Sequence, residues 1–569
     1  MTMDAAQVGG WERRGEEARG LLHAPAGWPV AARGRRVVLL GWACLSLQAR
    51  EGSGYNLSVS ELAAGLAMAG HRVYYLRSGI DYSVKPGMWI RAREFWRGVG
   101  CFDFVNSPNL ATANCNFKNV RGQMSSARQT AVVMDWLRAV RAELVHVHSL
   151  EGFGFDLIGA VRAAGIPVVV TPHNYYWLCP QVDLLHHERQ VCEDYEGGTR
   201  CVGCIPCPEP AAEVRLRRVR QTGRRLVGDG TTWRVGQAAA QFARHVRRLG
   251  DGPSVPITGN GEADNGKLAP PVIVPSPLDQ NERLLAGKGH LKVLNEYGER
   301  RAAAVAALNS ADRVLAPSRF LLEVHGAMGV KGEKLRHVQL GQPHFDALAE
   351  AARRSPFYDA KPWCAETATR PLSLAYFGST RYNKGLDTMV RAILELPAPV
   401  KARARFEMHA AGDVSEFKRV LHGEAVTWLG GYEVDELPAT IGEFDVGVLP
   451  TVGLENSPLV LLEHLHAGKF VIASRLGGPT EWVREPKNGL LFGAGDPKAL
   501  ARAMARVVLG EVKLPSAREV REASELRTHC EYVSEVMRAY EELLGPKNGE
   551  DAAIMGPAAG AAEVKEATC

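Results

Sequence analysis

The chain contains 569 residues, of which 46% are hydrophobic and 23% charged, with a formal net charge of +5. A chain of this length exceeds one ordinary hydrophobic core, so two domains plus irregular segments are expected. The composition is that of a soluble globular protein; eleven cysteines do not make a disulfide scaffold, and no short-period repeat indicates a solenoid. Residues 1–36 hold no apolar stretch suited to a signal peptide or membrane span, which predicts a cytoplasmic protein.

The first half of the chain opens with the pattern of a Rossmann-like α/β domain. After an extension at 1–34 that we expect to be disordered, the apolar run 36–41 predicts a buried strand, and a glycine-containing loop at 51–55 leads into an amphipathic helix and a strand at 72–76. The G-x-G-x-x-G spacing is absent, which argues against a dinucleotide oxidoreductase. Between 89 and 133 the pattern is irregular and predicts loops and a helix.

Two further strands are predicted at 143–148 and 167–171. The polar and aromatic run 172–177 falls at the carboxyl end of the second of them, where open α/β sheets place their ligands. A lone histidine is more often structural than functional, but this position makes His173 a candidate site residue.

Five cysteines crowd into the segment that follows. Cys192, Cys201, Cys204 and Cys207 have the spacing C-x8-C-x2-C-x2-C, and Cys179 lies upstream. Closely spaced thiolates joined by glycine and proline turns suit a structural zinc. Free thiols are the main alternative, an iron–sulfur cluster is a weaker one, and disulfides are disfavoured in a reducing compartment.

The segment from Arg215 to Arg248 is dense in arginine with little acid to balance it. Such a surface binds anionic lipid head groups or nucleic acid, or is simply solvated. No nucleic-acid motif or aromatic interleaving accompanies the arginines, so no nucleic-acid partner is expected. Peripheral contact with a membrane is the remaining candidate role, and the stretch 250–276 has the composition of a flexible insertion.

A second α/β domain is predicted after a linker at 346–370. The apolar run 372–377 predicts a strand, and the glycine-bounded loop 378–385 after it carries Arg381 and Lys384. Cations on such a loop, facing a diphosphate, would stabilise the charge that builds on a leaving group.

The stretch 444–492 contains a second strand, loop and helix start. Ser457 as N-cap and Pro458 at the first helical position predict a helix whose free N–H groups form an anion site. Glu455 and Glu463 are roughly two helical turns apart, and carboxylates accept hydrogen bonds from sugar hydroxyls. An ordinary βαβ unit with solvated glutamates would explain these features equally well.

Residues Glu455 to Glu463, followed by Ala467-Gly468, 471–474 and Gly477-Gly478, closely resemble the donor-site signature of retaining glycosyltransferases of family 4, also called glycosyl transferases group 1. The resemblance implies the GT-B fold, in which two Rossmann-like domains face each other across a cleft. The resemblance covers most of residues 36–544 apart from the insert at about 180–300. The glycine turn at Gly477-Gly478 would let the backbone approach a ligand closely.

The resemblance also implies roles for individual residues. Glu455 and His173 would contact the donor sugar, and Glu463 would contact the ribose hydroxyls of the nucleotide. Lys384 and Arg381 would stabilise the departing diphosphate.

Further donor contacts are implied for Gly54, Ser457, Leu459 and Val460, which would surround the phosphates through backbone groups. The chain departs from the family pattern in four places. Ser53 stands where the first glycine of the N-terminal loop is usual. Asn174 stands where an aspartate is usual, Ser379 replaces an arginine, and 341–344 replaces an Asn-Gly turn near the hinge.

The resemblance also implies how the chain is divided. An extension at 1–34 precedes an acceptor domain at 35–345, which holds a Cys-containing and Arg-rich insert at about 180–300. A linker at 346–370 leads to a nucleotide-sugar donor domain at 371–520, followed by a terminal helix that crosses back to the first domain at 521–545 and a disordered tail at 546–569.

The implied function is a retaining hexosyltransferase that moves a sugar from a nucleotide-diphosphate sugar to a glycan, lipid-linked or other acceptor. Cell-surface polysaccharide or glycoconjugate synthesis at the inner membrane face is the expected setting, and no metal or other cofactor is needed for the chemistry. A nucleotide-sugar epimerase of the same fold and a non-catalytic nucleotide-sugar-binding protein are the alternatives.

Overall fold

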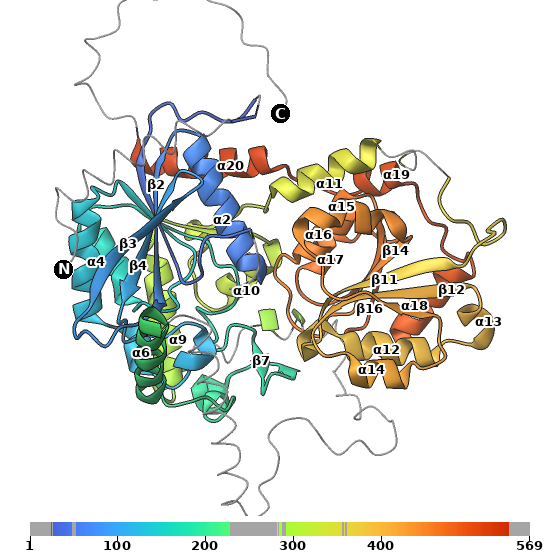
Figure 1. The fold of residues 1–569 in the computed structure, drawn as a ribbon, viewed down its shortest axis with the longest axis horizontal. Coiled ribbons are helices and arrows are strands. Elements are labelled where there is room, and N and C mark those ends of the chain that lie inside the picture. The colour runs from blue at the N-terminus through green and yellow to red at the C-terminus, as the bar shows by residue number, and fades with distance from the viewer. Residues whose placement is uncertain are drawn as a thin grey trace, which may run out of the picture.

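The computed structural model describes residues 24–25, 27–47, 53–227, 281–282, 284–286, 292–354, 358 and 361–545. Most of the expected N-terminal extension, the C-terminal tail and the insert from 228 to 280, including Arg244, Arg247 and Arg248, lie outside the described residues. The described residues form two α/β domains that lie side by side (Figure 1).

The first domain is built on an eight-stranded sheet in the order β10-β9-β6-β5-β1-β2-β4-β3. Its strands are β1 (Arg36–Gly41), β2 (Arg72–Asp81), β3 (Trp89–Trp96), β4 (Val99–Val105), β5 (Leu144–Val147), β6 (Val168–Val170), β9 (Arg313–Ala316) and β10 (Leu335–His337). All neighbouring strands are parallel except β3, which is antiparallel to β4. Helices cover both faces of such a sheet, which explains why its central strands are continuous apolar runs.

The edge of this sheet differs from the sequence-based expectation. The irregular stretch 89–133 contains a β-hairpin, β3 and β4, in addition to the expected helix, now α3 (Val120–Met124) and α4 (Ala127–Ala139). The sequence of β3 does not read as a strand because β3 is an edge strand with polar residues. Its Arg91 forms an ion pair with Asp81 on β2, with a nitrogen–oxygen distance of 2.6 Å. An edge strand satisfies its charges laterally, so it lacks the apolar pattern of a buried strand.

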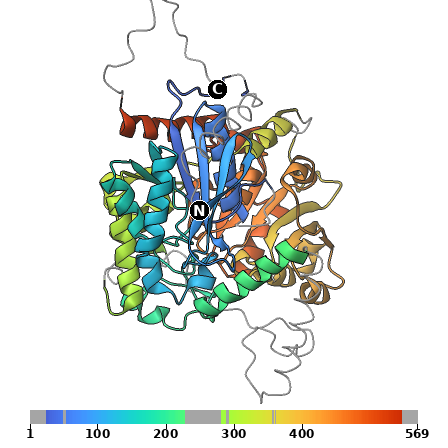
Figure 2. The same ribbon diagram turned by 60° about the vertical axis from the view of Figure 1, so that its left-hand side comes forward.

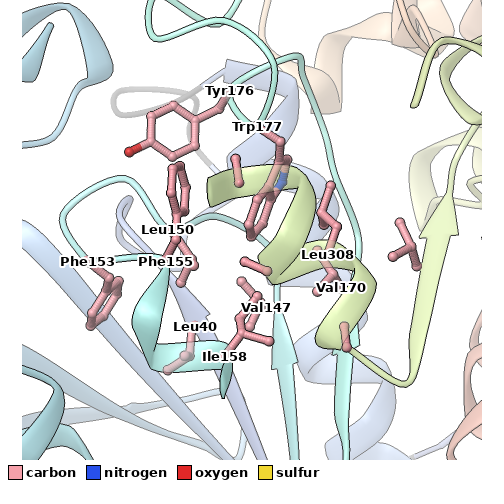
Figure 3. Close-up of a cluster of buried hydrophobic side chains, with 14 of the residues drawn as sticks. Leu40, Val147, Leu150, Phe153, Phe155, Ile158, Val170, Tyr176, Trp177 and Leu308 are labelled. Carbon is pink, nitrogen blue, oxygen red and sulfur yellow. The ribbon is translucent and has the colours of Figure 1, made fainter. Parts of the chain in front are cut away.

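The remaining helices of the first domain are α2 (Ser53–Met68), α5 (Asp156–Ala163), α9 (Glu296–Ser310) and α10 (Arg319–Ala327). Figure 3 shows part of the core that they form with the sheet, where Val147, Val170 and Leu308 lie below a layer of aromatic side chains. Tyr176 and Trp177 in that layer are 2% and 1% exposed. The loop after β6 is therefore packed into the core, which fixes the position of the histidine that precedes these residues.

The second domain has a six-stranded, fully parallel sheet in the order β13-β12-β11-β14-β15-β16. Its strands are β11 (Leu372–Ser379), β12 (Ala404–Ala411), β13 (Val426–Trp428), β14 (Val446–Leu449), β15 (Phe470–Ser474) and β16 (Gly489–Phe492). Its helices are α12 (Leu386–Glu395), α13 (Ala398–Lys401), α14 (Ser415–Val420), α15 (Leu437–Thr440), α16 (Leu459–His466), α17 (Pro479–Trp482), α18 (Pro497–Val508) and α19 (Ala517–Glu522). The two α/β domains confirm the predicted fold class.

Two helices connect the domains along one side of the molecule. These are α11 (Pro343–Arg354) and α20 (His529–Leu544), which lie along the top of Figure 1. On α20, Tyr540 is hydrogen-bonded to His146 of β5 with a 2.6 Å separation. The last helix of the chain is thus anchored in the core of the first domain.

The described part of the insert forms a short hairpin and one long helix. The hairpin pairs β7 (Leu185–His186) with β8 (Gln190–Val191), and the helix is α6 (Pro210–Val227). Arg217 of α6 donates hydrogen bonds to the carbonyl oxygens of Gly79 and Ala111, and Figures 1 and 2 show α6 along the edge of the first domain. In the described residues, no helix combines the length and the apolar character that crossing a membrane requires.

Candidate functional site

A cavity of about 1420 Å³ lies between the two domains. Many of the residues that line it come from loops at the carboxyl ends of parallel strands and from the first turns of helices, as expected for ligand sites in open α/β sheets, and α6 adds Arg217, Arg220 and Arg224. All nine residues predicted to act on or bind the donor line this cavity: Gly54, His173, Arg381, Lys384, Glu455, Ser457, Leu459, Val460 and Glu463.

Lys384 and Glu455 form an ion pair at the centre of the second domain's side of the cavity. The Nζ atom of Lys384 donates to Oε1 of Glu455 at 2.6 Å. Burial by itself would lower the pKa of Lys384, but the adjacent carboxylate of Glu455 raises it above its ordinary value. Lys384 is therefore a fixed cation, held ready for an anionic ligand.

Arg381 lies at the entrance to the short turn Tyr382–Lys384. Its side chain is exposed and, within the described residues, makes no ion pair or hydrogen bond. The loop on which both cations lie is held by Gly385 (φ +73°), where an added Cβ would meet the carbonyl oxygen of Pro450 at 1.7 Å. Only glycine allows that approach, which places the loop against the end of β14.

The start of α16 differs in detail from the prediction. Pro458, in an extended conformation, is the N-cap residue, and Ser457 makes no capping hydrogen bond because it lies one residue before the cap. The hydroxyl oxygen of Ser457 is buried without a hydrogen-bond partner in the described structure. The first N–H groups of the helix, on Leu459 and Val460, have no acceptor within the helix, so this end of α16 can receive an anion.

Glu463 is 3% exposed and engages both of its carboxylate oxygens. One is 3.1 Å from Nε2 of His344, and the other accepts a hydrogen bond from the hydroxyl of Tyr432 at 3.1 Å. His344 belongs to the segment 341–344 that departs from the family pattern near the hinge. The two partners hold Glu463 in a fixed orientation at the floor of the cavity.

The glycine turn after β15 has a different role from the one expected. It approaches backbone rather than a ligand: a Cβ at Gly478 would meet the carbonyl oxygen of Asn456 at 1.8 Å, and one at Gly477 would meet that of Glu455 at 2.5 Å. The N–H of Gly478 donates to the Glu455 carbonyl at 2.7 Å. The turn thereby supports the loop that presents Glu455.

From the first domain, His173 enters the cavity at the carboxyl end of β6. Its Nε2 lies 2.9 Å from Nδ1 of His148, and its ring packs edge-on against Tyr55. Burial lowers the pKa of His173 to about 3, so the imidazole is neutral at physiological pH. A neutral ring with one nitrogen held by His148 can exchange hydrogen bonds with a sugar hydroxyl.

The two domains touch directly at the cavity. The side chain of Asn456 donates to the carbonyl oxygen of His173 at 3.2 Å and accepts from the hydroxyl of Ser318 at 2.5 Å. Gly54 faces Leu459 from the opposite domain, where an added Cβ would lie 3.0 Å from the leucine side chain. The two domains are therefore in direct contact beside the cavity.

Sequence reasoning missed several acidic residues on the first domain's side. Glu151, only 2% exposed, lines the cavity just after β5 and accepts a hydrogen bond from the N–H of Ala113 at 2.7 Å. Burial raises its pKa to about 7. Its position after a buried strand was a usable signal. Asp183, in the Cys-rich segment, also lines the cavity, but no sequence pattern marks it.

The cysteines lie outside the cavity lining. Burial raises the pKa of Cys201 to about 12, and Cys179, Cys192 and Cys204 are close enough to act on it electrostatically, whereas Cys207 lies beside Lys118. Within the described part of the chain, no three His, Cys, Asp or Glu side chains are arranged to hold a metal, and the ten cysteines found there are free thiols. Metal binding by Cys192, Cys201, Cys204 and Cys207 therefore stays a prediction.

Comparison with known proteins matches two regions of the chain to glycosyltransferase families. The family described as Glycosyltransferase Family 4 matches residues 52–196, and Glycosyl transferases group 1 matches residues 371–509. A GDP-mannose-dependent alpha-(1-6)-phosphatidylinositol monomannoside mannosyltransferase of Mycobacterium tuberculosis is 29% identical over 136 residues, which are 22% of this chain and 35% of that protein. An uncharacterized glycosyltransferase of Methanocaldococcus jannaschii is 26% identical over 140 residues, 24% of this chain and 35% of that protein.

The chain thus spans about a third of the length of these curated relatives. Among solved structures, a sucrose-phosphate synthase from Thermosynechococcus elongatus has a TM-score of 0.51 at 16% identity, covering 90% of this chain and 99% of that one. An alpha,alpha-trehalose-phosphate synthase from Burkholderia xenovorans has a TM-score of 0.50 at 13% identity, covering 90% and 100%. The two matched regions indicate a glycosyltransferase of family 4, the glycosyl transferases group 1, and the architecture of the chain is the GT-B fold.

Proposed function

We propose that this protein is a retaining hexosyltransferase that uses a nucleotide-diphosphate sugar as donor. The observation that carries the proposal is the Lys384–Glu455 ion pair beside the start of α16, with His173 lining the same cavity from the other domain. A cation and free helix N–H groups suit a diphosphate, and the carboxylate and imidazole suit sugar hydroxyls. The curated relative named as GDP-mannose-dependent adds support for a nucleotide-sugar donor.

In the proposed reaction, the bond between C1 of the sugar and the diphosphate oxygen breaks while the acceptor oxygen bonds to C1 from the same face. The acceptor hydroxyl proton passes to the departing phosphate oxygen. Lys384, Arg381 and the N–H groups of Leu459 and Val460 stabilise the negative charge on the diphosphate. Electrostatic stabilisation of this kind is usually the largest single catalytic contribution.

The acceptor in this proposal is a glycan or lipid-linked molecule, in polysaccharide or glycoconjugate synthesis at a membrane surface. Helix α6 supports a peripheral membrane contact, because Leu216, Val219 and Leu226 are 43%, 67% and 79% exposed among its arginines. A basic amphipathic helix of this type binds anionic lipid surfaces. The relative that acts on a phosphatidylinositol monomannoside is consistent with such an acceptor.

A donor screen tests the proposal. The purified protein is incubated with UDP-, GDP- and ADP-sugars, and both thermal stabilisation and slow release of free nucleotide are followed. We expect one donor to stabilise the protein by about 2.7 kcal/mol at 100 times its dissociation constant. Analysis of the sugar product separates the candidates: retained anomeric configuration supports the proposal, an epimerised donor supports the epimerase, and binding without turnover supports a non-catalytic protein.

A further inference from the structure

The hairpin β7–β8 reaches from the first domain to the loop that carries Lys384. The guanidinium of Arg189 lies 5.6 Å from the ring centre of Tyr382, and the Leu185 side chain lies 3.6 Å from the position of a Cβ built on Gly453. Both partners belong to the second domain's cavity lining. This hairpin therefore closes one side of the cavity next to the donor cations.

The turn that leads into the hairpin presents Asp183 to the cavity. Val182 and Leu184, on either side of it, have φ values of +77° and +51°. Side chains with a Cβ rarely adopt such angles, and a β-branched residue least of all, so the surrounding structure must impose them. Hydrogen bonds do so: the N–H of Tyr175 donates to the Val182 carbonyl at 3.0 Å, and the N–H of Cys192 donates to the Leu184 carbonyl at 2.7 Å.

This strained turn separates apolar from acidic side chains. Leu184 and Leu185 are 0% and 1% exposed, whereas Asp183 lines the cavity together with Lys384 and Glu455. Within the described residues, the Asp183 carboxylate accepts no hydrogen bond. Burial raises its pKa to about 6, while the nearby Lys384 lowers it and Glu455 raises it. Asp183 is half-buried, so its carboxylate is only partly withdrawn from water, and a bound hydroxyl group would donate a hydrogen bond in place of that water.

We propose that Asp183 is a substrate-contacting residue whose carboxylate accepts hydrogen bonds from hydroxyl groups of the donor sugar, which makes the hairpin a third wall of the donor-sugar subsite. The inference rests on the proposed glycosyl transfer and deepens it. A carboxylate repels the diphosphate, so its ligand is the sugar. Because Asp183 neighbours the Lys384–Glu455 pair, that sugar is the one on the donor, while Glu151 remains available to the acceptor.

The test compares Asp183→Asn with the wild-type protein and with Asp135→Asn, an exposed aspartate on α4. Calorimetric titration with the donor found in the screen, and separately with its free nucleotide diphosphate, isolates the sugar contact. We expect Asp183→Asn to weaken binding of the nucleotide sugar about tenfold and not to weaken binding of the nucleotide diphosphate, because the lost carboxylate repels phosphate. Asp135→Asn should alter neither, and thermal unfolding should show Asp183→Asn to be no less stable than wild type at pH 7.5.

Deoxy analogues of the donor provide the second measurement. A donor analogue that lacks the contacted hydroxyl should bind wild type more weakly than the full donor does. Asp183→Asn should bind the analogue and the full donor with equal affinity. Equal losses for nucleotide and nucleotide sugar, an unchanged donor affinity, or a change in the acceptor KM alone would each overturn the inference. A wild-type protein that binds no nucleotide sugar would instead overturn the proposed function itself.

Discussion

At the scale of single residues, three histidines connect the last helix of the chain to the cavity. His146 lies between Tyr540 and Thr171, its ring is 4.1 Å from that of His148, and His148 contacts His173. Burial lowers the pKa of His146 to about 3 and that of His148 well below its ordinary value. All three rings are therefore neutral, and His148 is the residue that fixes the orientation of His173.

His148→Phe tests this orientation and gives a pH signature. Loss of the hydrogen bond should reduce kcat about tenfold, the equivalent of ~1.4 kcal/mol. Because the folded-state pKa is depressed, the unfolded chain takes up a proton below pH 6.5 while the folded protein does not, so the histidine costs stability as pH falls. When the pH falls from 7.5 to 5.5, the free energy of unfolding measured by urea titration should decrease in both proteins. The decrease should be about 1.4 kcal/mol smaller for the variant than for wild type. An equal decrease in the free energy of unfolding for the variant and wild type would contradict a buried, neutral His148.

Lys384→Ala tests the principal cation of the proposed reaction. Removal of the charge facing the diphosphate should reduce kcat by about 10²–10³-fold, measured by nucleotide release under saturating donor. Lys418→Ala, on the exposed face of α14, is the control and should retain full activity. Circular dichroism should show both variants folded; near-normal turnover by Lys384→Ala would exclude the proposed role.

At the scale of elements, the position of Glu455 depends on contacts between loops. The turn after β15 supports the backbone of residues 455–456, and the start of α12 supports the end of β14 through Gly385. In both places backbone approaches backbone too closely for any side chain. The donor side of the site is therefore assembled from several loops that hold one another.

Gly478→Ala tests this support and has a matched control. Its added methyl group would collide with the Asn456 carbonyl, so the loop must shift; we expect a loss of about 1–3 kcal/mol of stability and weaker donor binding. Gly442→Ala places its methyl group where no atom lies within 4 Å, and should be neutral or slightly stabilising. Thermal unfolding and donor titration of both variants measure the difference, and a Gly478→Ala protein with wild-type donor affinity would contradict the expectation.

At the scale of the whole molecule, polar contacts join the two domains beside the cavity. Glu481 of the second domain accepts hydrogen bonds from the N–H groups of Arg319 and Phe320 at the start of α10, at 2.8 and 2.5 Å. A carboxylate is stabilised at a helix N-terminus by the helix dipole and the free N–H groups. Together with the contacts of Asn456, this contact joins the two domains.

Glu481→Ala should therefore favour an open molecule. We expect a larger radius of gyration in small-angle X-ray scattering without donor, and a donor KM raised several-fold, because binding energy must now also close the domains. Glu522→Ala, an exposed position on α19, should change neither quantity. An unchanged radius in Glu481→Ala would show that the remaining contacts suffice for closure.

Much of the fold and the donor side of the site was predictable because its determinants are local. Continuous apolar runs identified most buried parallel strands, and the ordered run from Glu455 to Gly478 identified the donor loop. The edge strand Trp89–Trp96 escaped prediction because its charged residues are paired across the sheet. The cap of α16 was misassigned by one residue, since both Ser457 and Pro458 fit a helix start.

The sequence by itself predicted the resemblance to a known family, the parallel α/β architecture and nine of the residues that line the cavity, because strand and helix periodicity and the order of loop residues are properties of short segments. Only the tertiary structure decided which distant groups meet there. The Lys384–Glu455 pair, the contact between His148 and His173, and the entry of Asp183 from the Cys-rich segment each join separate loops. Such contacts arise from the packing of two domains, and no local pattern in the chain encodes that packing.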